Sequence, residues 1–355
     1  MTYALIGCGR ISPNHIAAAQ NNGLDITALC DTQNENMQKL IDQFGLKEVH
    51  CYRDYREMLQ KEKLDLVAIA TPSGMHAAIA LDCINSGCNV IIEKPVALSL
   101  EDADKLICAA KEKGVVACAC HQNRFNKSIQ KLHDAVKSNR FGRLYYGVAN
   151  VRWNRGLDYY KQAPWRGTFE QDGGALMNQC IHNIDLLRWM MGDEVSAVCA
   201  VTANQAHPFI EAEDMGLALV RFANGSFGII EGTTNIFPEN LEETLAIFGE
   251  QGTAKAGGKS VNLLEEWRFG DGLDSADEVK QSYREAPKGV YGFGHTPLYQ
   301  DVINAITDKV EPSIPLEAGR RALELVLAIY RSAYDRQWVQ LPLQRGSTLD
   351  YLEKL

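Results

Sequence analysis

Over the first 121 residues, short apolar runs alternate with amphipathic stretches that are long enough for helices. This alternation is typical of successive βα units, in which each strand of a parallel sheet is followed by a crossover helix. The runs are rich in Val, Ile, Ala and Cys, as expected of strands that are covered on both faces. We expect six strands, over residues 3–6, 25–30, 49–52, 65–70, 89–92 and 115–121, with helices between them.

From Arg143 onward the pattern changes to longer runs in which apolar and polar positions alternate. Runs such as LYYGVANVRW, GLALVRFANGSFGIIEGTTN and ETLAIFGE favour antiparallel strands, and Asn224-Gly225 predicts a hairpin between two of them. The polar, glycine-rich residues 270–294 predict a loop. This part of the chain is therefore an α+β domain with a large, mostly antiparallel open sheet. Helices are expected over residues 126–138, 174–191, 298–307 and 317–335.

The composition is that of a globular protein, with 46% hydrophobic and 23% charged residues in a chain of 355. No apolar run reaches the ~18 residues of a membrane span, and the N-terminus lacks the features of a signal peptide, so we expect a cytoplasmic protein. The net charge of −9 argues against a nucleic-acid binder, which needs a basic surface. The ten cysteines are unevenly spaced, which favours reduced, buried thiols and predicts neither disulfides nor a metal site.

Gly7, Gly9 and Ser12 lie in the turn between the first predicted strand and the first helix. Their order is similar to the GxGxxG fingerprint, in which N–H groups at a helix N-terminus hold a dinucleotide diphosphate. Asp31, 24 residues after Gly7, ends the second strand, where a carboxylate accepts hydrogen bonds from ribose hydroxyls. Since this carboxylate would repel a 2′-phosphate, and no arginine follows until Arg53, the sequence predicts NAD rather than NADP. We expect an α/β Rossmann domain at 1–122, with a returning C-terminal helix at about 298–335, and a substrate-binding and oligomerisation domain at 123–355.

Two further motifs follow predicted strands, at the edge where open α/β sheets bind ligands. They are Thr71-Pro72-Ser73 with His76 after the fourth strand, and Glu93-Lys94-Pro95 after the fifth. With GCGRIS and the later stretch DGGALMNQCIHNIDLL, they make essentially the whole chain resemble the Gfo/Idh/MocA oxidoreductases, the family of glucose-fructose oxidoreductase and inositol dehydrogenase. The resemblance implies an NAD-dependent enzyme that assembles as a homodimer or homotetramer.

The resemblance also implies which residues take part in the reaction. In the family, the lysine of the EKP motif touches the nicotinamide region and the substrate, which maps onto Lys94, and a helical histidine maps onto His182. Most members carry Asp four residues before this histidine, whereas this chain has Asn178. That asparagine, with WNRGLDYYKQAPWRG at 153–167 and Asn123-Arg124-Phe125-Asn126, is similar to one branch, the bacterial dehydrogenases that oxidise C3 of UDP-N-acetylglucosaminuronate.

Lys94, Asn178 and His182 suit the oxidation of a secondary alcohol, in which a base removes the hydroxyl proton as hydride leaves for the nicotinamide. Imidazole, with an ordinary pKa of about 6.5, suits the base, and Asn178 and His182 lie four apart on one helix face. Lys94 suits a cation for the developing alkoxide, but burial beside the cofactor would let it accept the proton itself, so both assignments stay open. Asn178 can only donate and accept hydrogen bonds, and Asp185 is a candidate to orient the imidazole.

Six basic residues and one acidic residue lie between Arg140 and Arg166, a local charge of +5. Arginines match diphosphate and carboxylate geometry, and the interleaved aromatic rings offer flat faces to a base or sugar, so this basic strip suits a nucleotide-sugar acid. Family members bring a Trp-Arg pair to the cofactor diphosphate, which makes Trp165 and Arg166 candidates for NAD as well as for substrate. The basic residues are Arg140, Arg143, Arg152, Arg155, Lys161 and Arg166.

The leading interpretation is NAD-dependent oxidation of a sugar or nucleotide-sugar hydroxyl, most concretely C3 of a UDP-N-acetylglucosaminuronate-like substrate in polysaccharide precursor biosynthesis. An inositol, polyol or simple sugar dehydrogenase is the alternative enzyme, and a non-catalytic NAD-sensing protein is disfavoured because Lys94 and His182 are both present. The predicted cofactor contacts are Gly7, Cys8, Gly9, Arg10, Ile11, Asp31, Thr71, Pro72, His76, Glu93, Lys94, Asn123, Trp165 and Arg166. The predicted substrate contacts are Arg124, Arg152, Arg155, Tyr160, Asn178, Gln179 and His182.

Overall fold

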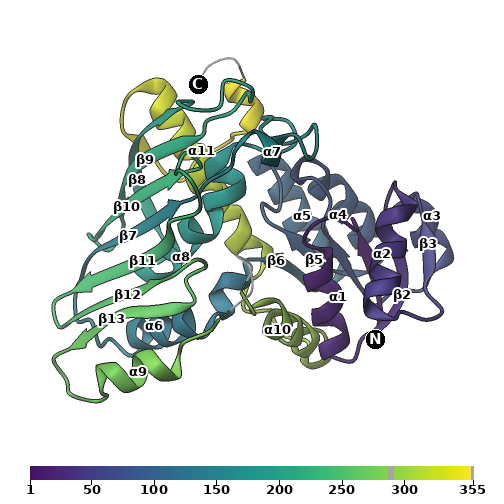
Figure 1. The fold of residues 1–355 in the computed structure, drawn as a ribbon, viewed down its shortest axis with the longest axis horizontal. Coiled ribbons are helices and arrows are strands. Elements are labelled where there is room, and N and C mark those ends of the chain that lie inside the picture. Colours follow the sequence, from purple (N-terminus) through teal and green to yellow (C-terminus); the bar gives the residue numbers. More distant parts are fainter. Residues whose placement is uncertain (287–291, 353–355) are drawn as a thin grey trace. The chain divides into compact units, whose positions relative to one another are not determined.

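The computed structural model describes residues 1–286 and 292–352 (Figure 1). The chain forms two compact units, one of Met1–His121 with His295–Arg320 and one of Gln122–Gly294 with Arg321–Leu355. Each unit has its own sheet and its own buried core. None of the helices in the described ranges has the length and apolar character that a membrane span requires.

The first unit is built on a six-stranded parallel sheet of order β3-β2-β1-β4-β5-β6. Strands such as β4 and β6 are buried at every position, which explains their unbroken apolar sequences. The chain leaves β1 for β2 on one side and later returns to β4 on the other, so β1 and β4 flank the topological switch point. The strands are β1 (Thr2–Ile6), β2 (Asp25–Cys30), β3 (His50–Tyr52), β4 (Leu66–Ile69), β5 (Asn89–Glu93) and β6 (Ala117–Cys120).

Helices connect these strands, and one helix from the C-terminal part of the chain joins them. This helix, α10 (His295–Asp308), packs against α1, and its Tyr299 hydroxyl lies 2.8 Å from the hydroxyl of Tyr3 on β1. The returning segment of this unit runs from His295 to Arg320, a residue within α11 (Leu316–Asp335). The other helices are α1 (Ser12–Asn21), α2 (Asn34–Phe44), α3 (Tyr55–Lys61), α4 (His76–Asn85) and α5 (Leu100–Lys113), with a 3₁₀ turn η1 (Ser73–Met75).

The second unit contains an eight-stranded sheet of order β13-β12-β11-β7-β10-β9-β8-β14. All its pairs are antiparallel except β7 with β10, which are parallel, and this confirms the predicted, mostly antiparallel sheet. Asn224-Gly225 forms the predicted hairpin between β9 and β10, with a φ of +85° at Gly225. The strands are β7 (Leu144–Arg152), β8 (Val195–Ala203), β9 (Met215–Phe222), β10 (Phe227–Thr233), β11 (Glu242–Gly249), β12 (Gly252–Gly257), β13 (Leu263–Phe269) and β14 (Val339–Gln340).

Helices cover one face of this sheet. α8 (Ile181–Met191) packs on β7, β10 and β11, and α6 (Lys127–Lys137) packs on β12 (Figure 1). Buried and exposed positions alternate along β9, because only one of its faces meets the core. The other face is apolar and exposed, with side chains from Val201, Leu217, Leu219, Phe227 and Ile229.

Two predicted segments differ from the structure. The helix expected over 174–191 begins as a π-helical turn, η3 (Leu176–Cys180), and becomes α-helical only at α8. The loop expected over 270–294 contains α9 (Ala276–Ser282), which carries acidic residues in its first turn and packs on β13, and residues 287–291 of that loop lie outside the described residues. All ten cysteines are free, and seven of them are buried, in agreement with the expected buried thiols. The remaining short elements are η2 (Gln122–Phe125), α7 (Leu157–Tyr160) and η4 (Thr348–Tyr351).

Candidate functional site

The turn between β1 and α1 has the geometry for binding a diphosphate through its backbone. Gly7 has a φ of +94°, and a Cβ there would lie 2.5 Å from the carbonyl carbon and oxygen of Ala70, so only glycine fits. Gly9 and Arg10 are exposed, and α1 begins directly after Ile11 without a side-chain cap. The N–H groups of Ser12 and Asn14 donate to the carbonyl oxygens of Gly9 and Ile11, and Pro13 has no N–H, so the donors that can meet an anion are those of the turn at residues 9–11.

Asp31 lies beside this turn, directly after β2. One carboxylate oxygen accepts a hydrogen bond from the N–H of Cys8 at 2.8 Å, and the other accepts from the N–H of Gln33 at 2.8 Å. The oxygen that accepts from Gln33 also accepts from Nδ2 of Asn36 at 3.3 Å, so the remaining lone pair is on the oxygen that accepts from Cys8, and it can accept from a ribose hydroxyl. The loop and Asp31 together fit the adenosine diphosphate half of a dinucleotide.

The turns after β4 and β5 contain the predicted contacts Thr71, Pro72 and Lys94 at the same carboxyl edge of the sheet. His76 joins these turns, because its Nδ1 lies 2.7 Å from the carbonyl oxygen of Pro95 and its Nε2 lies 2.8 Å from that of Thr71. The ring is 1% exposed. Both nitrogens of His76 are therefore occupied by the protein, which differs from the expected cofactor contact.

Glu93 is likewise turned inward. Its Oε1 lies 3.0 Å from Nε2 of His15 and 3.6 Å from Nε2 of His295. Burial would raise the pKa of Glu93, but hydrogen bonds from the two imidazoles outweigh burial and hold its pKa well below the ordinary value. Glu93 therefore anchors the turn that carries Lys94. Cys120 completes this buried cluster, whose four potential metal-ligand atoms lie within 4.8 Å of one another, a grouping that sequence spacing does not reveal.

In the second unit, a directed chain of hydrogen bonds joins several predicted substrate contacts. Arg155 donates through Nε to Oε1 of Gln179 at 3.0 Å. Gln179 donates through Nε2 to Oδ1 of Asn178 at 2.7 Å, and Asn178 donates through Nδ2 to the carboxylate of Asp172. Arg155 precedes α7, whereas both amides belong to η3. The structure thus brings together three residues of the predicted site and adds Asp172.

Tyr159 and Arg166 extend this chain. The Tyr159 hydroxyl accepts from Nη1 of Arg166 at 2.5 Å and from Nε2 of Gln179 at 2.9 Å. The Arg166 guanidinium lies 4.3 Å from the ring centre of Tyr159 and 4.5 Å from that of Trp165. Across residues 1–286 and 292–352, Arg166 has no carboxylate partner, and its buried Nε makes no hydrogen bond. A guanidinium held between aromatic rings in this way suits a phosphate or carboxylate ligand.

His182 begins the α-helical part of the same helix and is 8% exposed. Its Nε2 lies 3.5 Å from the side-chain nitrogen of Gln122, which precedes the predicted contact Asn123. The π-helical turn that contains Asn178 ends just before His182, so the two residues are not related by the regular α-helical turn that we assumed. Such turns are uncommon and occur frequently at functional sites.

Glu213 determines where this helix begins. Its Oε1 accepts a hydrogen bond from the N–H of Leu176 at 2.7 Å and lies 2.9 Å from the hydroxyl of Tyr330. Gly174 has a φ of +103°, and a Cβ there would overlap the Glu213 carboxyl group. Burial raises the pKa of Glu213 to about 8, so the group is mostly protonated at neutral pH.

Arg124, Asn123 and Arg152, all predicted to bind ligands, are committed to other protein groups. Arg124 forms a buried bidentate ion pair with Asp185, the residue that the sequence suggests as a partner for His182. Asn123 is 3% exposed and donates to Glu243 at 3.1 Å. Arg152 pairs across the sheet with Glu231 on β10 and Glu242 on β11.

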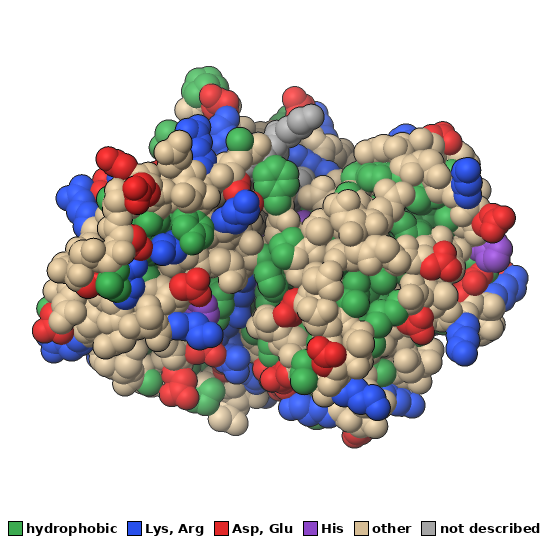
Figure 2. Space-filling model, turned by 90° about the horizontal axis from the view of Figure 1, so that it is seen from below, with side chains coloured by type: hydrophobic (Ala, Val, Ile, Leu, Met, Phe, Trp, Pro, Cys, Tyr) green, Lys and Arg blue, Asp and Glu red, His purple; other side chains and the backbone are tan. Residues whose placement is uncertain are grey.

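The basic strip is not one charged surface. Arg140 pairs with Asp271 and Asp274, as Arg152 pairs with two glutamates, so acids that are distant in sequence neutralise much of the strip. On the face in Figure 2, Lys and Arg side chains are likewise interspersed with Asp and Glu. Arg155 and Arg166 are the members of the strip whose guanidinium groups lie over the ring of Tyr159.

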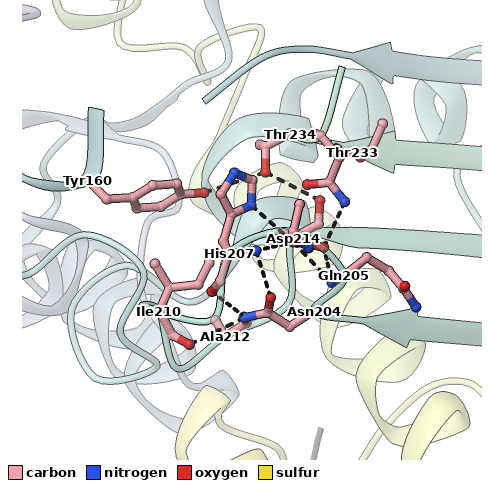
Figure 3. A network of polar contacts seen from close by, with 11 residues as sticks. Tyr160, Asn204, Gln205, His207, Ile210, Ala212, Asp214, Thr233 and Thr234 are labelled. Atoms are coloured by element: carbon pink, nitrogen blue, oxygen red, sulfur yellow. Dashed lines mark hydrogen bonds and ion pairs between the residues drawn. The ribbon is translucent and has the colours of Figure 1, made fainter. Parts of the chain in front are cut away.

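Tyr160 packs against a loop that is held by Asp214 (Figure 3). Its hydroxyl lies 3.5 Å from Oγ1 of Thr234, and its ring centre lies 5.3 Å from that of His207. Asp214 accepts from Nδ1 of His207 and from the N–H groups of residues 205–207. Burial would raise the pKa of Asp214, but these hydrogen bonds, with one from Asn235, outweigh burial and lower it. Tyr160 thus packs against a loop that hydrogen bonds to Asp214 hold in place.

Three residues of this site were not among the predicted contacts: Tyr159, Asp172 and Gln122. Tyr159 adjoins the predicted Tyr160, and the sequence does not show which ring meets the arginines. Asp172 opens the DGG triplet, where an acid before two glycines marks a turn that leads into a helix. Gln122 carries no signal in sequence, because its contact with His182 joins residues 60 positions apart.

Comparison with family models assigns both parts of the chain. Residues 1–121 match the model described as "Oxidoreductase family, NAD-binding Rossmann fold". Residues 129–255 match the model of the "GFO/IDH/MocA C-terminal domain". Both matches agree with the parallel and mixed sheets observed.

Solved structures show similarity over the whole chain. The WlbA dehydrogenase of Bordetella pertussis, in complex with NADH and UDP-GlcNAcA, is 39% identical, with a TM-score of 0.89 over 97% of this chain and 98% of that one. The WlbA enzyme of Chromobacterium violaceum, with the same ligands, is 35% identical, with a TM-score of 0.88 over 97% and 96%. Among curated proteins, a D-apiose dehydrogenase of Paraburkholderia graminis is 27% identical over 95% of this chain and 89% of that protein.

Proposed function

Because this chain belongs to the Gfo/Idh/MocA family of NAD-dependent oxidoreductases, we propose that it oxidises the C3 hydroxyl of UDP-N-acetylglucosaminuronate or a closely similar nucleotide-sugar acid. Its activity is that of an NAD-dependent sugar or polyol dehydrogenase, and the nucleotide-sugar is the step that we propose. Similarity at 39% and 35% identity to two enzymes solved with NADH and UDP-GlcNAcA supports this choice over simple sugars.

The observation that carries the proposal is the arginine and aromatic cluster of Arg155, Tyr159, Trp165 and Arg166. An uncharged polyol would offer no anion to the Arg166 guanidinium, which has no carboxylate partner among the described residues. A nucleotide-sugar acid has a diphosphate and a carboxylate for the arginines, and a planar base and a sugar for the aromatic faces.

In this proposal the first unit binds NAD. The N–H groups of Gly9, Arg10 and Ile11 hold the diphosphate, because those of Gly7 and Cys8 donate to Cys30 and Asp31. Asp31 accepts from the adenosine ribose. When it is bound, NAD supplies the acceptor for the hydride from the sugar carbon. Thr71, Pro72 and Lys94 line the carboxyl edge toward the nicotinamide.

The second unit and Lys94 act on the sugar in this proposal. His182 accepts the hydroxyl proton on its imidazole, and the ammonium of Lys94 stabilises the developing alkoxide. The alternative, in which Lys94 accepts the proton, uses the same two residues with the roles exchanged. Asn178 and Gln179 orient the sugar hydroxyls through hydrogen bonds.

A substrate panel tests the proposal. The purified protein with NAD should convert UDP-N-acetylglucosaminuronate to a product two hydrogens lighter, detected by mass spectrometry alongside NADH absorbance. UDP-N-acetylglucosamine is the matched control, since it differs only in a hydroxymethyl group in place of the carboxylate, and it should react far more slowly. The apparent affinity should fall as salt is raised, because arginine–anion contacts are screened.

A simple sugar or polyol dehydrogenase is the second candidate, and the similarity to D-apiose dehydrogenase favours it. This class would be supported over the nucleotide-sugar dehydrogenases if apiose or inositol were turned over faster than every UDP-sugar and if the affinity for that substrate did not change with salt.

We also propose that the chain forms a homodimer or homotetramer through the open face of the second sheet. Exposed apolar residues there, including Leu219 on β9 and Phe227 on β10, form a surface that a monomer would expose to water. Light scattering should give a mass of two or four chains, and Leu219→Asp should shift it toward one chain. A monomeric wild-type protein would contradict the proposal.

A further inference from the structure

Asp172 is a buried carboxylate between two elements of the substrate site. It is 3% exposed. Oδ2 accepts a hydrogen bond from the N–H of Gly167 at 2.7 Å, in the turn that follows Arg166. Oδ1 accepts from Nδ2 of Asn178 in η3. One side chain thus joins the arginine-bearing turn to the helix that carries Asn178.

The N–H of Gly167 and Nδ2 of Asn178 are both donors, so each oxygen of Asp172 must accept from one of them. A carboxylate meets this requirement, whereas an amide of the same shape would place an NH₂ group against one of the two N–H donors. Leaving a buried donor without an acceptor is costly. The chemistry of the position therefore calls for an acid and not merely for a side chain of this size.

The same logic fixes the orientation of two amides. The chain begins at Arg155, which can only donate, and ends at Asp172, which can only accept. Between these ends, Gln179 receives at Oε1 and donates from Nε2, and Asn178 receives at Oδ1 and donates from Nδ2. If the amide of Asn178 were rotated by 180°, its Nδ2 would face Nε2 of Gln179, so two donors would meet. If the amide of Gln179 were also rotated, its Nε2 would face the donor Nε of Arg155 instead. The two charged ends thus select one orientation of both amides.

We propose that Asp172 is a positioning residue for the dehydrogenase reaction, which sets the orientation of Asn178 and Gln179 toward the sugar hydroxyls. This role rests on the proposed function, since it concerns the hydroxyls that those amides would bind. Asp172 does not touch the reacting atoms, and it acts through Asn178.

A double-mutant cycle tests this role. Asp172→Asn should lower kcat by about 10- to 100-fold, the usual effect of losing a hydrogen bond to a charged group. In the Asn178→Ala background, where no amide remains to be oriented, the same change should lower kcat less than about twofold. An equal loss in both backgrounds, or no loss in the first, would overturn the proposal.

An exchange variant protects the test against a simple folding defect. In Asp172→Asn/Asn178→Asp, residue 172 can accept from Gly167 and donate to the new acid, which still accepts from Gln179. Most of the lost kcat should return, and a variant as slow as Asp172→Asn would contradict the orientation argument. Asp158→Asn, on the exposed surface of α7, is the matched control and should leave kcat unchanged.

A measurement without substrate separates this inference from the proposed function. The side-chain amide signal of Asn178, identified by its loss in Asn178→Ala, should exchange with solvent at least about tenfold faster in Asp172→Asn, because the carboxylate acceptor is gone. If exchange is faster but no UDP-sugar is turned over, the proposed substrate is wrong and the orienting role of Asp172 is supported. Unchanged exchange would remove the orienting role whatever the substrate is.

Discussion

Arg124 and Asp185 form a bidentate ion pair in which Nε and Nη2 each lie 2.6 Å from a carboxylate oxygen. The two side chains are 5% and 0% exposed, and the same carboxylate accepts from Arg188 at 3.1 Å. The geometry is that of a structural pair, because the guanidinium face that would meet a carboxylate ligand is already occupied.

Arg124→Met should therefore lower the free energy of unfolding by about 3–5 kcal/mol, since it leaves Asp185 short of a partner in the core. Urea denaturation measures the loss. Arg143→Met, at an exposed arginine, is the control and should cost less than about 1 kcal/mol. A stable Arg124→Met protein with a raised KM for substrate would instead restore the ligand contact that the sequence predicts.

Glu213 should make stability depend on pH. Its pKa is about 8 in the folded protein and about 4.5 when unfolded, so the folded state holds a proton that the unfolded state has released between these values. The stabilisation is complete below pH 4.5 and is lost as pH rises through about 8, by at most about 1.4 kcal/mol per pH unit. Urea midpoints between pH 5.5 and 8 should fall accordingly.

The variant Glu213→Gln isolates this effect. A glutamine stays neutral at every pH, so the slope of stability against pH should become shallower than in the wild type. Glu170→Gln, at an exposed glutamate nearby in sequence, should leave the slope unchanged. Equal slopes in wild type and Glu213→Gln would show that this carboxyl group does not titrate in the range.

Asp31 should govern the choice of dinucleotide. We expect NADH to bind more tightly than NADPH in a fluorescence titration, because the carboxylate repels a 2′-phosphate. Asp31→Ser should weaken NADH binding by about tenfold, because hydrogen bonds to the ribose are lost, and it should reduce the preference for NADH over NADPH. Asp25→Ser, at the exposed start of β2, is the control. Tighter binding of NADPH by the wild type would contradict the assignment.

The sequence was most informative where structure depends on local pattern. The six strands of the first sheet lie within two residues of their predicted ends, because buried parallel strands are runs of apolar residues. The turn at Gly7 was also predictable, since a glycine there reflects a close backbone approach to Ala70.

The sequence was least informative where a side chain's partner is distant along the chain. Arg152 looks like a ligand contact until the sheet places Glu231 and Glu242 beside it. The π-helical turn at Asn178 also has no periodic signature, because it depends on Glu213 and on the packing around it. Local pattern therefore gave the elements, but tertiary pairing decided which arginines remain for a ligand.

The buried cluster around Glu93 should not need a metal ion for the stability of the protein or for NADH binding. Nε2 of His15 lies 3.0 Å from the buried carboxylate, which therefore has a hydrogen-bond partner within the protein and does not need a cation for one. Dialysis against EDTA should leave the melting temperature and NADH affinity unchanged, and Cys120→Ser should melt near the wild type. About one zinc per chain by mass spectrometry, with a lower melting temperature after chelation, would contradict this.

The pH dependence of kcat should show whether His182 or Lys94 accepts the hydroxyl proton. His182→Ala and Lys94→Ala should each lower kcat at least about a hundredfold while NADH still binds, since in the proposed reaction each residue acts on the reacting hydroxyl. If His182 is the base, kcat of the wild type should fall as pH drops through the range in which an imidazole protonates, and this limb should be absent from His182→Ala but present in Lys94→Ala. If the limb instead disappears in Lys94→Ala, the lysine accepts the proton. Near-normal turnover in either variant would remove that residue from the chemistry.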